Sequence, residues 1–540
     1  MSNEKVKTRS KSLAKSSVKT PVKPIVKTLA KSPEIDGNQL WASRFSKTTD
    51  PISKRYTESV TIDRPMVLQS IWGSEAHVIM LAKQGIIKDL HCKKILEALQ
   101  EIKKEYSAGT WDLSLQEEDA QMNIERYAIE KVGIENAGRM HTCRSRNDQV
   151  PLDTKLYTRD RLIEVIENVT QMVDVLLKQA DSHTETLMPG YTHIQHAQPI
   201  TYAYWLTHHV AVFLRDTKRL LAAYDTNDSN PLGAGAISGT SFPIDRKLTT
   251  ELLGFKTIQE HALDAIGNKD STIEILSVMS ILFATISRIA NEIIYNISCE
   301  FDTMILDDGF SMGSSMMPQK KNPGVLELVR GRTGKMYGML MHMLTLMKGL
   351  HSGYNRDYHE DKVTLVEGLQ LTNETIEVIK GVMETLKIKK ERMEFLATQN
   401  FATATELANY LVKKHDIPFR LCHRIVGHVV RALVAEGKNF TDKKRTKELL
   451  AEKDIKISDV DYDQYLTPKH VIKNYDCIGG VAPKEVTRMI REMRKTNSVN
   501  KKEIDAIKNR IVTAQQKTAK IVNLILKQNK TAEQALKAVL

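Results

Sequence analysis

"DSTIEILSVMSILFATISRIANEIIYNISC", residues 270–299, contains neither glycine nor proline. Its apolar side chains recur every three or four residues, which draws a single stripe along one face of a helix. The stripe consists of Ile275, Met279, Leu282, Ile286, Ile289, Ile293 and Ile297. At about 1.5 Å per residue, such a helix is roughly 45 Å long. An apolar face of this length must be buried against other helices.

Long helical runs of the same kind occur at four further places, some of them interrupted by single glycines. They span residues 152–182, 202–225, 324–350 and 364–398. Because several such helices can bury their apolar faces only against one another, they predict a helix bundle. Strand-like alternation of apolar and polar residues is nearly absent. We therefore predict an all-α fold.

Polar, glycine- and proline-containing loops separate these runs, and functional residues are often found on such loops. The loops span residues 138–149, 188–199, 230–243 and 313–323, and a further polar stretch spans 352–362. From about residue 385 the helical runs become shorter. We predict four regions: a basic tail at residues 1–37, an N-terminal helical domain at 38–145, a central bundle at 146–384 and a C-terminal helical domain at 385–540.

The formal net charge of +12 is concentrated at the N-terminus. Residues 1–33 carry nine Lys or Arg and one acidic residue, and a lysine occurs at every fourth position from Lys7 to Lys31. With three prolines and little apolar surface, this repeat predicts a disordered, solvated tail. Polyanion binding and organelle targeting through residues 1–33 are the alternatives. The rest of the chain is close to neutral, which argues against a nucleic-acid-binding body.

Several classes of protein lack support in the sequence. Five cysteines, never in CxxC spacing, argue against a disulfide framework and against a zinc site, and favour a reducing compartment. We expect no secretory signal, because the N-terminal residues show no apolar h-region, and the charge-free apolar run 275–287 is shorter than the ~20 residues that span a bilayer. We therefore expect a cytoplasmic protein. No GxSxG, P-loop, GxGxxG or HExxH motif occurs.

The segment "GSSMMPQKKNP" at 313–323 predicts a flexible cationic loop, because its prolines disfavour helix and its side chains are too polar for a core. Taken alone, Ser314 is most simply a turn residue and His193 a structural histidine. Together the loops suit a small, multiply charged substrate. Cationic groups for its carboxylates are Arg144, Arg146, Lys320 and Lys362, and neutral orienting groups are Ser59, Asn147, Thr192, Asn322 and Tyr354.

Several motifs resemble one known family. "GSSMMPQKKNP" fits the GSxxMxxKxN signature of the fumarase/aspartase superfamily, and its particular residues are similar to those of the argininosuccinate lyase family. The likeness continues, in the same order and spacing, from residue 40 to about 485. It includes "LW…RF" (40–45), "HTCRSRNDQV" (141–150), "MPGYTHIQHAQPIT" (188–201), "PLGAGAISGTSFPIDR" (231–246), "YNRD…EDK" (354–362) and "FATATELANYLV" (401–412).

The resemblance implies an anti elimination that cleaves argininosuccinate into arginine and fumarate, a carbon–nitrogen lyase reaction of arginine biosynthesis. It implies no metal and no cofactor. The implied catalytic residues are Ser314, His193, Lys320, Asn322 and Glu327. Ser314 is favoured as the base and His193 as the acid, but the opposite assignment stays open. The implied substrate-binding residues are Ser59, Asp63, Ser145, Arg146, Asn147, Thr192, Tyr354, His359 and Lys362.

The resemblance also implies three helical domains and a homotetramer, in which central helices of four subunits merge and each active site draws on three subunits. Two alternative functions remain. One is a related lyase that acts on another N-substituted aminosuccinate, and the other is a non-catalytic structural relative.

The chain departs from the family pattern at five positions. Gln121 stands at a common histidine and His359 at a common glutamine, which suggests that two neighbouring sites have exchanged side chains. Ser70, Cys143 and Lys269 also differ from the usual residues. Because His359 lies where the amine portion is recognised, these changes bear on substrate identity more than on reaction type.

Overall fold

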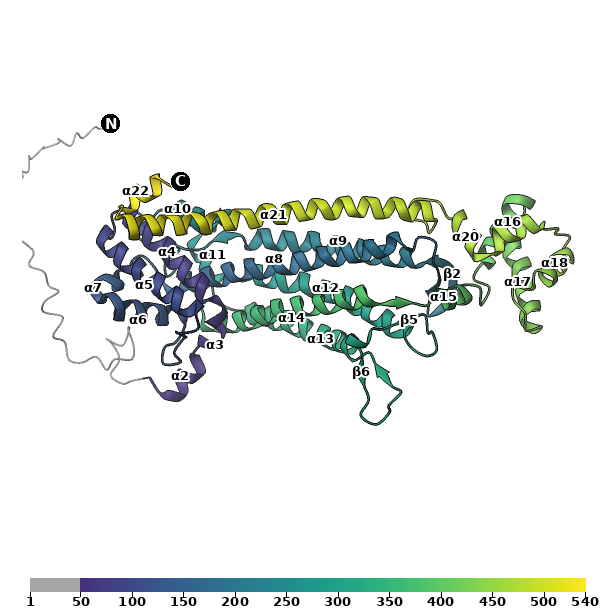
Figure 1. The fold of residues 1–540 in the computed structure, drawn as a ribbon, viewed down its shortest axis with the longest axis horizontal. Helices are drawn as coiled ribbons and strands as arrows, with labels where there is room; N and C mark the ends of the chain where they lie inside the picture. The colour runs from purple at the N-terminus through teal and green to yellow at the C-terminus, as the bar shows by residue number, and fades with distance from the viewer. Residues whose placement is uncertain (1–48) are drawn as a thin grey trace, which may run out of the picture.

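The long helices lie side by side in the computed structural model, which describes residues 49–540 (Figure 1). The predicted tail at 1–37 and the "LW…RF" motif at 40–45 lie outside the described residues. Between the ends of the bundle run α8 (Arg146–Asp181), α9 (Tyr202–Asn227), α12 (Asp270–Asn296), α13 (Gly324–Met347) and α14 (His359–Thr385). The prediction of a mostly helical protein with long helices is confirmed.

Helix α12 forms the centre of the bundle, where it packs against α9, α13 and α14. The side chains of its predicted stripe from Ile275 to Ile293 are buried, whereas Ile297 caps the helix end and is only partly buried. By length and composition α12 could cross a membrane, and it is the one helix among residues 49–540 that meets this test. Most of its apolar window is buried inside the protein, as expected for a core helix.

Helix α8 begins six residues earlier than the sequence suggested. Its N-cap is Ser145, and Pro151 lies inside the helix. The predicted loop at 138–149 therefore ends at Ser145. A capping box explains the early start, because the Ser145 and Asp148 side chains each satisfy a backbone N–H of the first turn.

The predicted helical run at 364–398 is wrong in its extent. Helix α14 starts at His359 and ends at Thr385, and a separate helix, α15, spans Lys390–Ala397. Between them, strand β8 (Lys387–Ile388) pairs with β5 (Met304–Ile305). This segment contains no glycine or proline, so tertiary pairing overrides its helical propensity.

The loop predicted at 188–199 is instead most of a β-hairpin. Strand β1 (Leu187–Thr192) pairs antiparallel with β2 (Gln195–Thr201), and the two residues of the turn are His193 and Ile194. The sequence concealed this hairpin because two-residue turns usually contain Asn-Gly or a similar pair.

Short pairings and helices complete the central region. The β6–β7 pair brackets residues 314–320, and the loop between the two strands projects from the side of the bundle (Figure 1). The elements are β3 (Ser229–Asn230), which pairs parallel with β4 (Thr257–Ile258), α10 (Arg246–Leu253), α11 (Ala262–Gly267), η4 (Asp308–Phe310), β6 (Met312–Gly313), β7 (Lys321–Asn322) and η5 (Arg356–Tyr358).

The N-terminal helices cover one end of the bundle and share its continuous apolar core (Figure 1). Helix α4 connects them to the bundle through contacts with α8. They are α2 (Pro51–Thr57), α3 (Val60–Asp63), η2 (Arg64–Met66), α4 (Val67–Lys83), α5 (Asp89–Ser107), α6 (Ala120–Val132), α7 (Ile134–Ala137) and η3 (Gly138–His141).

The region predicted as a C-terminal domain, 385–540, consists of two differently placed parts. Helices α16 to α19 enclose a separate apolar core, and they lie with α20 at the far end of the molecule (Figure 1). Helix α21 then returns along α8 and α9 to the N-terminal helices. The elements are α16 (Ala404–His415), α17 (Phe419–Ala435), α18 (Lys443–Ala451), α19 (Asp459–Leu466), α20 (Pro468–Asn474), α21 (Pro483–Gln528) and α22 (Ala532–Lys537).

Candidate active site

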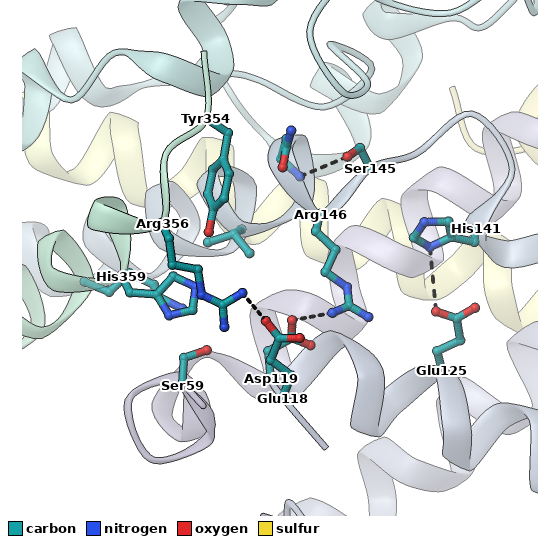
Figure 2. Close-up of a pocket in the computed structure, with 13 residues that line it drawn as sticks. Ser59, Glu118, Asp119, Glu125, His141, Ser145, Arg146, Tyr354, Arg356 and His359 are labelled. Atoms are coloured by element: carbon teal, nitrogen blue, oxygen red, sulfur yellow. Dashed lines mark hydrogen bonds and ion pairs between the residues drawn. The ribbon is translucent and has the colours of Figure 1, made fainter. Parts of the chain in front are cut away.

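A cavity of about 650 Å³ opens where the N-terminal helices meet the start of α8 and α14 (Figure 2). Seven of the predicted substrate-binding residues line it, and they come from three separate parts of the chain. These residues are Ser59, Ser145, Arg146, Asn147, Tyr354, His359 and Lys362. One chain therefore brings most of the predicted binding group together.

The "SRND" motif at 145–148 builds one wall of the cavity. The Asp148 carboxylate is fully buried and accepts hydrogen bonds from the backbone N–H groups of Ser145 (2.9 Å), Gly233 (3.0 Å) and Gly235 (2.9 Å). Gly235 has a left-handed backbone, and a Cβ there would lie 2.6 Å from the Gly239 carbonyl oxygen. Asn147 adds a bond from its Nδ2 to the Ala236 carbonyl (2.9 Å). These contacts fix the start of α8 to the 231–239 loop.

Two arginines at this point of the chain, Arg144 and Arg146, have different environments. Arg144, which we had grouped with the carboxylate-binding residues, is buried beside α4 and donates to Ser74 Oγ at 3.0 Å. It does not line the cavity. Arg146 does line it, and its guanidinium contacts the Asp119 carboxylate at 2.6 Å. Arg144 is therefore packed inside the protein, and Arg146 is the one that faces the cavity.

A buried ion pair forms the floor of the cavity. Lys362 Nζ lies 2.5 Å from Asp63 Oδ1, and both side chains are almost fully buried. Ser59 Oγ donates to Asp63 Oδ2 at 2.8 Å, and the Ala120 N–H approaches the same oxygen at 3.3 Å. These contacts fix the position of the Lys362 side chain at the base of the cavity. The structure thus places Asp63 directly beneath the lining residues, as a partner of two of them.

Sequence reasoning missed the acidic wall of the cavity. Glu118 pairs with Arg356 (2.5 Å), Asp119 pairs with Arg146, and Glu125 lies 3.6 Å from His141 (Figure 2). Burial raises the pKa of Glu125 and of Asp119, the latter against the lowering effect of Arg146. Cations and carboxylates thus face each other across the cavity, which suits a zwitterionic ligand. In the sequence these residues look like ordinary solvated charges.

Tyr354 reaches the cavity from the segment before α14, and His359 reaches it from the first residue of α14. Burial, with the nearby charges of Lys362 and Arg356, lowers the pKa of His359 to about 4, so its imidazole is neutral near pH 7. Burial raises the pKa of Tyr354, which keeps its hydroxyl as a neutral donor. An ion pair between Lys269 and Asp361 (2.8 Å) fixes the start of α14 against α12.

The predicted catalytic serine lies elsewhere, in the loop between β6 and β7. Ser314 Oγ accepts hydrogen bonds from the backbone N–H groups of Met317 (3.0 Å) and Met316 (3.3 Å). Lys321 Nζ contacts Asp308 Oδ1 at 2.5 Å, whereas Lys320 is exposed and forms no ion pair within residues 49–540. Backbone N–H groups that donate to a hydroxyl oxygen favour its ionised form.

His193 lies at the tip of the β1–β2 hairpin and is exposed, as is Thr192 beside it. His193 and Ile194 both have left-handed backbones, with φ of 56° and 58°. This conformation is unfavourable for a β-branched residue such as Ile194. Strained backbone of this kind is found preferentially at functional sites. The hairpin presents His193 outward rather than into a cavity of its own chain.

The length of the helices separates these groups within one chain. Helix α8 has 36 residues and connects the Ser145 end of the cavity to the hairpin, a span of roughly 54 Å. Helix α13 has 24 residues and separates the Ser314 loop from Tyr354 by roughly 36 Å. Asn322 precedes α13, and Glu327 is exposed on its first turn, with no ion pair to His193 among residues 49–540. One chain therefore does not bring the predicted catalytic residues to the cavity.

Comparison with known proteins decides the family. A family model described as "Lyase" matches residues 43–338, and one described as "Argininosuccinate lyase C-terminal" matches 401–473, the region of α16 to α20. An argininosuccinate lyase of Streptococcus pneumoniae is 39% identical over 467 residues, which cover 86% of this chain and 99% of that protein. The chain belongs to the argininosuccinate lyase family.

Other members of the argininosuccinate lyase family give the same result. The argininosuccinate lyase of Anoxybacillus flavithermus is 44% identical over 404 residues, which cover 75% of this chain and 88% of that protein. Among solved structures, EDDS lyase in complex with formate has a TM-score of 0.78 and 26% identity, covering 90% of this chain and 97% of that one.

Proposed function

We propose that the protein cleaves argininosuccinate into L-arginine and fumarate. The observation that carries this proposal is the full-length likeness to argininosuccinate lyases, combined with a cavity lined by facing cations and carboxylates. The substrate has carboxylates at both ends and cationic groups between and beside them. Arg146, Arg356 and Lys362 suit the carboxylates, and Glu118 and Asp119 suit the cationic groups.

The proposed active site is shared between subunits of a homotetramer. In support, the lengths of α8 and α13 keep the cavity, the Ser314 loop and the His193 hairpin tens of ångströms apart in one chain. Helix α13 also exposes large apolar side chains on one face, among them Met341 (62% exposed) and Leu344 (44% exposed). An exposed apolar helix face of this kind is typical of a subunit interface. A neighbouring subunit would bring its Ser314 loop, and a third its His193 hairpin, to the cavity.

In the proposed reaction, Ser314 Oγ removes a proton from the succinyl carbon next to a carboxylate. The backbone N–H groups of Met316 and Met317 stabilise the ionised oxygen that this step requires. Lys320 and Asn322 stabilise the charge that develops on the neighbouring carboxylate. The electron pair then forms the double bond of fumarate as the carbon–nitrogen bond breaks. His193, oriented by Glu327, protonates the departing guanidino nitrogen, and Thr192 helps to position the substrate.

His359 favours one alternative, a lyase that acts on a different N-substituted aminosuccinate. The resemblance places this residue at the amine end of the substrate, and a neutral imidazole offers one donor and one acceptor there rather than a primary amide. The structural likeness to EDDS lyase makes EDDS the natural comparison substrate.

An ultraviolet assay for fumarate, run with argininosuccinate and with EDDS, tests the proposal. We expect rapid release of fumarate from argininosuccinate and little from EDDS. Fumarate from EDDS but none from argininosuccinate would establish the alternative. The Ser314→Ala variant serves as the matched control for contaminating activity.

A further inference from the structure

A second buried carboxyl lies beneath the cavity and has no role in the proposed reaction. Asp153 is on α8, one turn after the lining residue Val150, and is 4% exposed. Its Oδ2 is 2.6 Å from Gln121 Nε2. Gln121 directly follows Ala120, whose N–H points to the Asp63 carboxylate under Lys362. Asp153 is therefore connected to the Asp63–Lys362 pair through its hydrogen bond with Gln121 and the neighbouring Ala120 N–H.

The contacts around Asp153 fit a protonated carboxylic acid as well as an ionised carboxylate. Gln121 Oε1 is buried and accepts no hydrogen bond from any residue in 49–540. Rotation of the Gln121 amide would bring this oxygen to Asp153, where it would accept an O–H group. The 2.6 Å separation is in the range of O–H···O bonds and shorter than a usual N–H···O bond. The buried Gln121 oxygen thus offers an acceptor for a proton on Asp153.

The charged groups that face Asp153 come from every neighbouring element. Asp63, at the end of α3, repels a second negative charge, and Arg144, just before α8, attracts it. Arg144 is shared with the carboxylates of Asp148 and Glu125, which reduces its effect on Asp153. Ser70 of α4 and Gln121 of α6 contribute neutral hydrogen bonds. Burial dominates and raises the pKa of Asp153 to about 7.

We propose that Asp153 is a proton-binding positioning residue that sets the charge of the cavity floor. In its protonated form it donates to Gln121 and adds no charge beside the Lys362–Asp63 pair. When it ionises, a second negative charge appears beside Asp63 and opposes the anionic ends of the substrate. Asp153 itself does not touch the substrate. This inference rests on the proposed function for the identity of the substrate only.

The first test is the pH dependence of KM. For the wild type we expect KM for argininosuccinate to rise roughly three- to tenfold between about pH 6 and 8.5, with kcat changing much less, because ionisation acts on binding. In Asp153→Asn, whose amide stays neutral, KM should keep its low-pH value throughout this range. A KM that varies with pH equally in both proteins would overturn the proposal.

Ser70→Ala provides a second variant that keeps the carboxyl. Ser70 stabilises the ionised form of Asp153, so its removal should move the rise in KM to higher pH. A shift to lower pH, or no shift, would contradict the proposal. Asp216→Asn is the matched control, because Asp216 is a buried carboxyl on α9 that does not line the cavity. Its KM profile should follow the wild type.

A thermal unfolding series separates this inference from the proposed function. A carboxyl whose pKa is higher in the folded than in the unfolded state makes stability fall as pH rises from about 4 to about 7. The Tm of Asp153→Asn minus that of the wild type should therefore increase over this range and then level off. A difference that stays constant with pH would overturn the inference, even if argininosuccinate is cleaved. A pH-dependent difference without cleavage would overturn the proposed function alone.

Discussion

The cavity at the Ser145 end of the bundle and the loops that carry Ser314 and His193 are built in opposite ways. The cavity is closed by buried ion pairs and capped helix starts, as the Lys362–Asp63 pair and the Asp148 bonds illustrate. The loops are exposed and tied down mainly by local backbone contacts. One chain thus brings together seven of the predicted substrate-binding residues, whereas the predicted catalytic residues lie on loops away from the cavity.

Replacing Ser314 with alanine should give the largest effect. Loss of the base should lower kcat by a factor on the order of 10²–10⁴, while substrate still binds to a cavity that Ser314 does not line. The measurements are fumarate release and calorimetric binding of argininosuccinate. Ser315→Ala, one residue along the same loop, is the control and should retain most of its activity. Near-normal turnover by Ser314→Ala would remove this residue from the mechanism.

Mixed oligomers test whether the cavity and the Ser314 loop of one active site come from different subunits. Arg146→Gln damages the cavity and Ser314→Ala damages the loop, and each variant alone should be nearly inactive. If a site draws these parts from different subunits, random mixing in equal amounts leaves both intact in about a quarter of the sites. We therefore expect about a quarter of wild-type activity after co-expression. Recovery of none would mean that both groups come from the same chain.

The rigidity of the cavity wall predicts a stability effect. Asp148→Asn replaces a carboxylate that accepts three backbone hydrogen bonds with an amide that has one acceptor oxygen. We expect a loss of about 1.5–3 kcal/mol in the free energy of unfolding. Urea denaturation would measure it. Asp307→Asn is the control. Asp307 caps the short helix η4, and its side chain accepts one backbone hydrogen bond, from Gly309.

The smallest expected effect is the contribution of His359 to the loss of stability at acidic pH. Its pKa of about 4 in the folded protein is below the usual 6.5, so the unfolded chain binds the proton more readily between these values. Stability should therefore fall as pH drops from about 6.5 to 4. His359→Gln removes this contribution and should gain about 1 kcal/mol relative to the wild type at pH 5, but not at pH 7.5. Thermal unfolding at the two pH values checks the prediction.

The sequence predicts the bundle well, because its signal is local. The stripe from Ile275 to Ile293 is buried as expected, and the resemblance places Ser59, Tyr354 and Lys362 in one cavity. The start of α8 and the end of α14 were misplaced, because a capping box and a two-residue strand pairing decide them. The return of α21 along the bundle was missed as well, because helical periodicity predicts a helix but not the helices against which it packs.

Side-chain environments were harder to predict than helices. Arg144 and Arg146 are two residues apart, yet one is buried beside Ser74 and the other lines the cavity. Glu118 and Arg356 are far apart in sequence, and neither stands out until the fold pairs them. The suggested exchange between Gln121 and His359 stays a prediction, although both residues lie within the network around Asp63. Such relations depend on tertiary contacts that no single stretch of sequence encodes.

The uninterrupted 36 residues of α8 have a consequence for how this protein can change over time. In the proposed tetramer, this helix would set the distance between two parts of each shared site, so its length would have to be the same in every subunit. Adding one heptad would lengthen it by about 10 Å and would misalign all the sites of the proposed tetramer at once. Insertions and deletions should therefore be tolerated in the outlying α16–α20 unit or at the termini, and rejected in the bundle.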